Sequence, residues 1–244
     1  MSVPHLQASR ENYWAVNSDS TEKVAPRVQP KPESYFWPLL SLVVVIVPQV
    51  AIPARLRLGP IVAVPIVEGI VVLILLGIAA KRGPVPARLR PLILTLFSIL
   101  VVANASAAGR LVSQVMKGTP AGHHPPSATR LLVATGMVLA TNIVTFALLY
   151  WQIDAGGPDA RRSDEPHYPD FQFPQTGDDE IAPPGWVPRF GDYLYAAFNN
   201  IVTFAPVDAL PLTGRTKLLT AVQSVISVTT LILVLARVIN LLPQ

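Results

Sequence analysis

The 244-residue sequence contains no cysteine and few charged residues. The absence of cysteine excludes disulfide bonds, thiolate metal sites and thiol catalysis. Charged residues make up only 14% of the chain, whereas soluble domains carry roughly 25%. The sequence also lacks a phosphate-binding glycine loop, a nucleophile elbow, a zinc-protease histidine pair and a kinase-like motif set. We therefore expect no enzyme activity, no catalytic residue and no cofactor.

Apolar residues are abundant instead, at 51% of the chain, with a mean hydropathy of +0.44. Five apolar stretches reach the roughly 20 residues that cross a hydrocarbon core about 30 Å thick. The predicted crossings are residues 35–54, 60–80, 91–116, 130–151 and 216–242. The predicted fold is thus an all-α, polytopic transmembrane bundle with about five crossings plus a short re-entrant or interfacial helix, in the cell (plasma) membrane.

The net charge of +4 comes from Lys and Arg in short clusters that flank the apolar stretches. Lipid headgroups explain such clusters, so the bilayer is an expected partner and nucleic acid is not. Residues 1–34 are polar and lack apolar periodicity, which predicts a flexible tail. Because the first apolar stretch begins near Tyr35, we expect the first helix, rather than a cleavable signal peptide, to direct insertion. The pair His123–His124 is too isolated from other ligands to predict a metal site.

An acidic loop is expected between the fourth and fifth crossings, over residues 152–188. It holds eight of the chain's 15 carboxylates, three of them in Asp178-Asp179-Glu180. It also carries aromatic side chains among prolines, which are unusual in a plain solvated linker. We therefore expect this loop to lie at the interface, cap the bundle or bind a membrane-complex partner.

A short segment follows this loop, from Phe190 to Thr203. As a helix of about 14 residues it spans only some 21 Å, too little for a full crossing. A Pro-containing run follows it, and then the last apolar stretch. This order predicts a re-entrant half-helix, which is tolerated only where protein or water covers its backbone.

The order of outer helix, acidic loop, short helix, loop and inner helix resembles the pore module of tetrameric potassium channels. Filters of that family read T-V-G-Y-G-D, then two residues, P, one residue and T. The corresponding run here is Thr203-Phe204-Ala205-Pro206-Val207-Asp208-Ala209-Leu210-Pro211-Leu212-Thr213. Thr203, Asp208, Pro211 and Thr213 fall on the family's positions without a gap. The chain is also similar to a group of uncharacterised bacterial multi-pass membrane proteins in which a D-Y-L-Y-type segment precedes a comparable loop.

The resemblance covers residues 130–244 and departs from the family where the ion is selected. Ala205 and Val207 replace both filter glycines, and Pro206 replaces the aromatic residue. Glycine is needed where the backbone visits left-handed regions, whereas a β-branched residue is strained there and proline has a fixed φ. The resemblance thus implies a pore-like loop with a degenerate filter that is not potassium-selective.

Several polar side chains interrupt the apolar stretches. Glu68 is an intramembrane ionisable group, for which ion or proton handling competes with a protonated, hydrogen-bonded structural role. Asn142 is expected to make an interhelical hydrogen bond. Asn199 and Asn200 either lie near the pore or cap the short helix. The stripe of Gln223, Ser227 and Thr230 either lines an aqueous path or bonds backbone within the bundle.

These features divide the chain into a tail (1–34), three transmembrane helices (35–129) and a pore-like module (130–244). The leading hypothesis is a homo-oligomeric membrane protein of ion-channel-like architecture. A non-conducting accessory subunit and a small-solute or proton-coupled transporter remain as alternatives. Orientation stays open, because the channel-like pattern places the basic segment Lys81–Arg90 outside, against the positive-inside tendency, whereas a sixth crossing at 190–207 would place it inside.

Overall fold

The computed structural model describes residues 33–51, 63–80, 89–117, 127–163, 167–178, 180–206 and 208–240. Nearly all of its regular structure is helical. The main helices are α2 (Phe36–Ala51), α3 (Ala63–Ala80), α4 (Arg90–Lys117), α5 (Ala128–Ile153), α6 (Phe190–Val202) and α7 (Gly214–Ile239). Two single turns, η4 (Asp154–Gly156) and η5 (Ala160–Arg162), follow α5, and two-residue strands β1 (Phe171–Gln172) and β2 (Leu210–Pro211) pair antiparallel.

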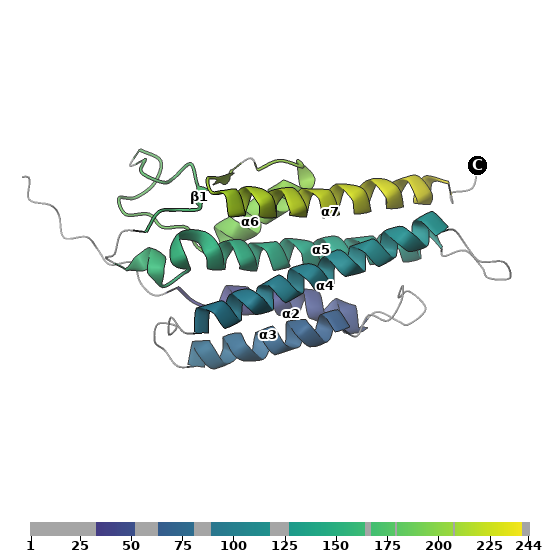
Figure 1. Cartoon of the computed structure of the whole chain (residues 1–244), viewed down its shortest axis with the longest axis horizontal. Helices are drawn as coiled ribbons and strands as arrows, with labels where there is room; N and C mark the ends of the chain where they lie inside the picture. Colours follow the sequence, from purple (N-terminus) through teal and green to yellow (C-terminus); the bar gives the residue numbers. More distant parts are fainter. Residues whose placement is uncertain are drawn as a thin grey trace, which may run out of the picture.

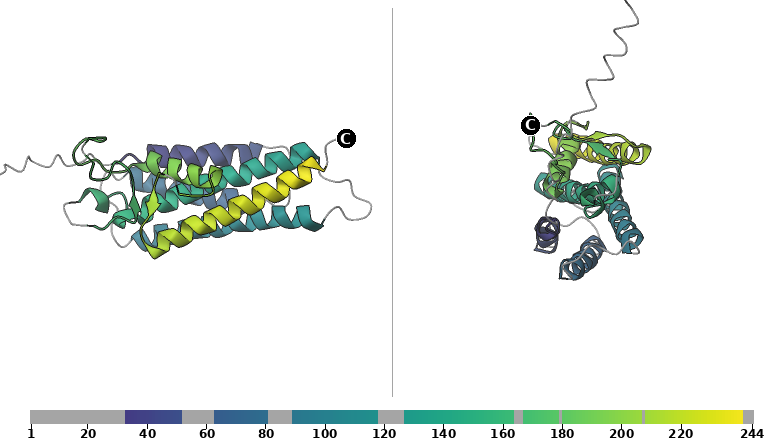
Figure 2. Two further views of the ribbon diagram at one scale, coloured as in Figure 1. Left: turned by 90° about the horizontal axis from the view of Figure 1, so that it is seen from above. Right: turned by 90° about the vertical axis from the view of Figure 1, so that its left-hand side faces the viewer.

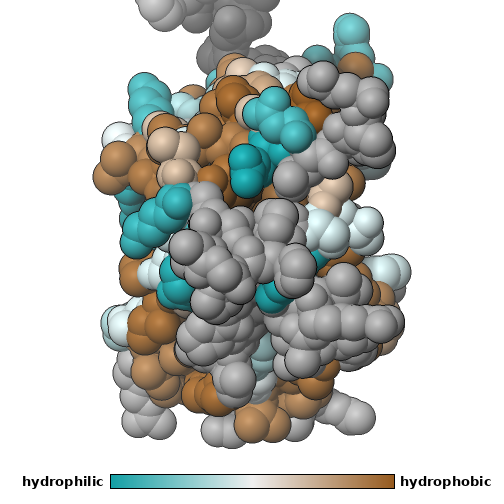
Figure 3. Space-filling model, turned by 90° about the vertical axis from the view of Figure 1, so that its right-hand side faces the viewer, coloured by the Kyte–Doolittle hydropathy of each residue, from teal (hydrophilic) through white to brown (hydrophobic). Residues whose placement is uncertain are grey.

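The helices lie side by side in an elongated antiparallel bundle (Figure 1). α2, α4 and α7 run in one direction, and α3 and α5 run in the other. We call the end at which α5 ends and α6 and α7 begin the loop end, and the opposite end the far end. At the far end, apolar side chains extend around the visible sides of the bundle, with hydrophilic ones scattered among them (Figure 3).

Three described helices are long and apolar enough to cross a membrane. They are α4, α5 with its following turn, and α7. α2 and α3 are apolar too, with described lengths of 16 and 18 residues, and they contain the shorter apolar helical segments Phe36–Val47 and Pro65–Gly77. The predicted count of about five crossings is therefore not confirmed, but the bounds of α4, α5 and α7 agree with three of the predicted ranges to within three residues.

α5 is the central helix of the bundle. It lies between α6 and α7 on one side and α2, α3 and α4 on the other (Figure 2). Its last two turns are buried on every face, from Val144 to Ile153. A helix that is apolar all round belongs in a core, and this stretch includes the largest side chains of that core, Phe146, Tyr150 and Trp151.

The central position of α5 predicts a large difference between two identical truncations on it. Leu148 is fully buried and Leu132 is 47% exposed. Leu148→Ala should lower the free energy of unfolding by about 2–5 kcal/mol because it leaves a cavity. Leu132→Ala should change it by no more than about 0.5 kcal/mol. Denaturant unfolding in detergent micelles, followed by tryptophan fluorescence, measures both values; equal effects would contradict this placement of α5.

Candidate functional site

α6 enters the bundle from the loop end and stops before the far end. At 1.5 Å rise per residue its 13 residues span roughly 20 Å, whereas the 26 residues of α7 span roughly 39 Å. The chain then returns to the loop end, where β2 pairs with β1 and Leu212 N–H donates to the carbonyl of Asp170 (2.8 Å). α6 therefore does not traverse the bundle, as Figures 1 and 2 also show.

Local chemistry fixes both ends of α6. At its start, the carboxylate of Asp192 accepts a hydrogen bond from the backbone N–H of Arg189 (2.7 Å), which is the half of a capping box that an acidic third residue supplies. At its end, the Thr203 N–H still bonds to Asn199, but Phe204 has a φ of +56°. That left-handed conformation is unfavourable for a bulky residue and ends the helix. Pro206 follows and cannot donate to a helical bond.

The side chain of Gln223 on α7 joins three helices. Its Nε2 donates to the carbonyl of Ala197 on α6 (3.0 Å). Its Oε1 accepts from Asn200 Nδ2 on α6 (2.8 Å) and from the Tyr150 hydroxyl on α5 (2.7 Å). Gln223, Asn200 and Tyr150 are each 1% exposed or less. Gln223 thus ties α6 and α5 to α7.

Asn200 adds further bonds between α6 and α7. Its Nδ2 also lies 3.1 Å from the carbonyl of Thr220, and its Oδ1 accepts from the Ser224 hydroxyl (3.0 Å). Asn200 therefore faces α7, while its neighbour Asn199 hydrogen-bonds Asp208 in the returning segment. In none of these hydrogen bonds does the side chain of Asn199 or Asn200 cap the end of α6.

The polar stripe on α7 faces the chain's own bundle. Gln223, Ser227 and Thr230 are fully buried. The hydroxyls of Ser227 and Thr230 donate to carbonyls one turn earlier, at 2.8 and 2.7 Å. These bonds correspond to the second interpretation of the stripe, in which hydroxyls bond backbone. Lining of an aqueous path by the stripe stays a prediction.

The turn after α6 is exposed on the side of the bundle. Thr203, Phe204 and Ala205 are all exposed, and Pro206 is half-buried. The Thr203 hydroxyl donates to Asn199 O at 2.8 Å and lies 2.7 Å from Ala205 O. Beyond these contacts the turn has irregular backbone without a ladder of hydrogen bonds. Val207, also assigned to the pore-like loop, lies outside the described residues, as does the pair His123–His124.

Two buried aspartates hold the acidic loop to the helices. The Asp154 carboxylate accepts from the backbone N–H groups of Asp170 (2.6 Å) and Phe171 (3.0 Å), and from the Tyr193 hydroxyl on α6. The Asp170 carboxylate pairs with Arg215 at the start of α7, at 2.8 and 2.5 Å. No individual role was predicted for these two acids within the acidic loop; the signal for Asp170 is that it stands directly before the aromatic Phe171, which is buried.

Glu33 forms a third anchor at the loop end. Its carboxylate accepts from Trp151 Nε1 (3.0 Å), Arg162 Nη1 (2.8 Å) and Phe190 N–H (2.6 Å). The predicted flexible tail of residues 1–34 overlaps the described structure only at its last two residues, and there these three charge-assisted bonds join Glu33 to the bundle. Residues 1–32 of the predicted tail lie outside the described part of the chain.

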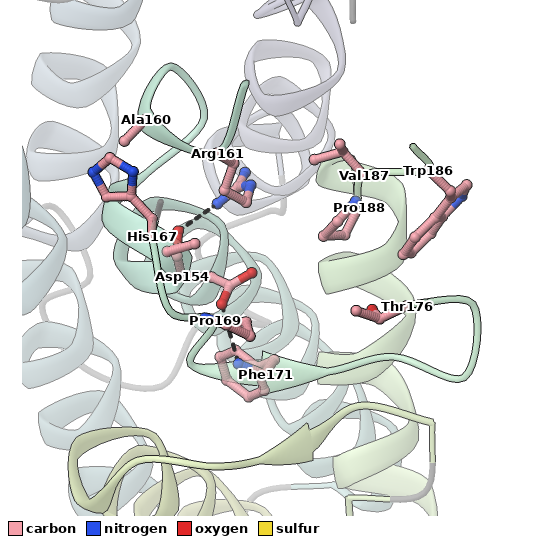
Figure 4. Close-up of a pocket in the computed structure, with 11 residues that line it drawn as sticks. Asp154, Ala160, Arg161, His167, Pro169, Phe171, Thr176, Trp186, Val187 and Pro188 are labelled. Atoms are coloured by element: carbon pink, nitrogen blue, oxygen red, sulfur yellow. Dashed lines mark hydrogen bonds between the residues drawn. The ribbon is translucent and has the colours of Figure 1, made fainter. Parts of the chain in front are cut away.

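A pocket of about 270 Å³ opens among these anchors (Figure 4). Arg161, His167 and Ala160 lie across it from Trp186, Val187 and Pro188. Arg161 Nη1 already donates to the carbonyls of Trp151 (2.7 Å) and Asp154 (2.9 Å). Ligand pockets usually measure about 300–1,000 Å³, so this pocket is slightly below the usual size. The hydrogen bonds of Arg161 hold the loop to the end of α5. Within the described residues no three His, Asp or Glu side chains are grouped as metal ligands.

Glu68 lies apart from this loop, between α3, α2 and α5. It is 1% exposed, and Gln49 donates to its carboxylate. The interhelical hydrogen bond predicted for Asn142 is present, since its Nδ2 donates to Asn104 Oδ1 on α4 (3.1 Å).

No protein-family model, curated protein or solved structure matches the chain. The resemblance of residues 130–244 to a channel pore module therefore stays a prediction from sequence, and the geometry described above is the basis for assigning a function.

The Asp170–Arg215 pair predicts an acid-sensitive step in stability. Burial raises the pKa of the Asp170 carboxyl, but hydrogen bonds from Arg215 and Thr213 and the Arg215 charge lower it by more, so the pKa lies below its usual value. Ionised Asp170 then stabilises the fold above the unfolded pKa of about 4, and this stabilisation is lost as pH falls through the lower, folded pKa. The loss of stability as pH falls should therefore be smaller for Asp170→Asn than for wild type, as measured by acid unfolding in detergent.

The matched control is Glu180→Gln, which removes an exposed acid from the same loop. Its acid-unfolding profile should follow that of wild type. An unchanged profile for Asp170→Asn would contradict the role of the pair.

Gln223→Leu tests the attachment of α6. Leucine removes both hydrogen-bonding atoms, so Asn200 and Tyr150 each lose one partner. The free energy of unfolding should therefore fall by about 2–5 kcal/mol. Ser227→Ala, one turn away on the same buried stripe, should lower the free energy of unfolding by at most about 1 kcal/mol. The carbonyl that accepts from Ser227 remains bonded within the helix. Thermal unfolding and proteolysis near residues 203–206 measure the two variants, and equal losses would show that Gln223 is not the tie between helices.

Proposed function

We propose that the chain is a multi-pass membrane protein of pore-like, oligomeric architecture, in which residues 190–213 form a re-entrant helix and loop. α2 and α3 complete five crossings in this proposal. The start of α2, the acidic loop and the junction between α3 and α4 then share one side of the membrane, and the end of α7 lies on the other. The filter-like loop is degenerate, and we expect no potassium selectivity.

The observation that carries the proposal is the exposed, non-helical turn at Thr203–Ala205. Asn200 packs beside Gln223, which is nine residues into α7 and thus about 14 Å from its start. The turn begins three residues beyond Asn200, about 4.5 Å further along α6, and so lies near the middle of a core about 30 Å thick. Irregular backbone at that depth is tolerated only where protein covers it or water reaches it. A single chain in lipid supplies neither.

Apolar side chains surround this turn on the same surface. Phe198 and Val202 on α6 are 47% and 57% exposed, and Phe204 in the turn is 43% exposed. Together they offer an aromatic and aliphatic face on which a second copy of the chain can pack. Assembly around an axis near Thr203 would cover the backbone and leave a narrow space for water.

A second candidate function is a non-conducting accessory subunit that uses the same face or the loop to bind a different membrane protein. It is favoured by exposed apolar residues in the acidic loop, where Tyr168 is 94% and Ile181 is 58% exposed. Asp154 and Asp170 are engaged in bonds within the chain. Binding of a partner at the loop would therefore rely on exposed apolar residues such as Tyr168 and Ile181 rather than on these charges.

Single cysteines test the proposal directly, because the chain has none of its own. Thr203→Cys in intact membranes should react with a charged, impermeant methanethiosulfonate and should form disulfide-linked dimers on oxidation. Val102→Cys is the matched control, since it is 64% exposed near mid-height of α4 and away from α6. It should do neither, because lipid excludes the charged reagent.

The outcomes separate the two candidates. Cross-linking with thiol reactivity supports the water-lined homo-oligomer, whereas an accessory subunit bound to a different membrane protein should give neither a disulfide-linked dimer of this chain nor reactivity with the charged reagent. If position 203 reacts only with a lipophilic maleimide and forms no dimer, both the oligomer and the shared axis are ruled out.

A further inference from the structure

A carboxylic acid lies inside the bundle at mid-height. Glu68 on α3 is 1% exposed, its carboxyl accepts from the amide of Gln49 on α2, and that same amide donates to Thr141 on α5. Thr141 is the fourteenth of the 26 residues of α5, so it marks the middle of a helix long enough to cross a membrane. Glu68 therefore lies near mid-height of the bundle, far from both ends of α5.

The hydrogen bonds around Glu68 come from a neutral donor. Gln49 Nε2 lies 3.2 and 2.9 Å from the two carboxyl oxygens and 3.1 Å from the Thr141 hydroxyl oxygen. An amide NH₂ has two hydrogens for these three acceptors. One hydrogen bond therefore serves the carboxyl, and the other serves Thr141.

No cation compensates this carboxyl within the described residues. α2 contains no charged residue and α3 contains none but Glu68. The basic residues of the two packed helices are Arg90, Arg110 and Lys117 on α4 and Arg130 on α5, and no Lys or Arg in the described ranges is within ion-pair distance of Glu68. Val45, one turn before Gln49 on α2, and Val71, three residues after Glu68 on α3, are buried members of the apolar core.

We propose that Glu68 is a proton-binding site, with the carboxyl protonated at neutral pH and Gln49 and Thr141 as its polar cradle. An ionised carboxylate without a cation is disfavoured in apolar surroundings, whereas the neutral acid needs only ordinary hydrogen bonds. Gln49 can donate to the carboxyl in either protonation state, so the proton can leave and return without loss of the cradle. This inference is independent of whether the chain oligomerises through α6.

A proton fits the cradle better than a metal cation. The group that faces both carboxyl oxygens is an N–H donor, which repels a cation, and the described residues place no second carboxylate beside Glu68. Hard metal cations prefer a shell of several oxygen ligands. The ligand class is therefore H⁺, delivered from water that reaches mid-height when the bundle opens.

Infrared spectroscopy of the protein in nanodiscs tests the proposal without needing a transported solute. At pH 7 the spectrum should contain the C=O stretch of a protonated carboxylic acid, and this band should be absent from Glu68→Gln. Raising the pH should convert it to carboxylate bands. Glu180→Gln, which removes an exposed acid of the loop, should leave the band in place.

Further variants keep the test decisive if Glu68→Gln does not fold. Glu68→Asp should retain the band at a shifted frequency, and Gln49→Leu should hold it to higher pH because the donor that stabilises the carboxylate is gone. A Glu68 that stays protonated in a purely structural role would give a band that does not change with pH. The proposal is overturned if no protonated-acid band is present at pH 7, or if the band persists in Glu68→Gln and is unaffected in both Glu68→Asp and Gln49→Leu.

Discussion

The hydrogen bonds of Gln223 hold the α6 insertion in place. α6 has only 13 residues, and helices of that length are marginal on their own. Its position therefore depends on contacts, and three of the polar bonds meet at the side chain of Gln223, which reaches Ala197, Asn200 and Tyr150. Because these groups are buried, each bond that is lost leaves an unsatisfied partner. The cost of that loss keeps α6 in a single register against α7.

The same constraint explains how the loop end is built. Asp154, Asp170 and Glu33 are acids in an apolar setting, and each accepts several hydrogen bonds from backbone or side-chain donors. The bonds tie the chain before and after α6 to fixed points, so the short helix begins and the return segment ends at the same end of the bundle. In the described part of the chain, the turn at residues 203–206 is held by local hydrogen bonds of Thr203 and not by a buried acid. That contrast is why the turn, and not the loop, is the basis of the proposed oligomer.

The long helices were predictable from sequence because their apolar length dominates every other signal. α4, α5 and α7 lie within three residues of the predicted ranges, and α6 was predicted as a short helix from its mixed composition. The direction of the polar stripe was not predictable. Helical spacing places Gln223, Ser227 and Thr230 on one face, but it does not say whether that face meets a neighbouring subunit or the chain's own α5 and α6. Glu33 was missed because nothing near it in the sequence marks the partners that order it.

The internal contacts of the acidic loop were also beyond sequence reasoning. A carboxylate in a loop rich in acids is usually solvated, and the partners of Asp170, namely Arg215 and Thr213, are more than 40 residues away. By contrast, Glu68 stands out in any reading because a charged residue in an apolar helix is costly. What sequence could not supply was its cradle, since Gln49 and Thr141 come from two different helices.

Native mass spectrometry of the protein released from lipid nanodiscs measures the central claim most directly. The chain has a mass of 26.3 kDa. If the exposed turn after α6 is covered by a second copy, the dominant species should be a multiple of that mass, and Gln223→Leu should shift it toward the single chain. A wild-type protein that is entirely monomeric across lipid compositions and concentrations would contradict the account.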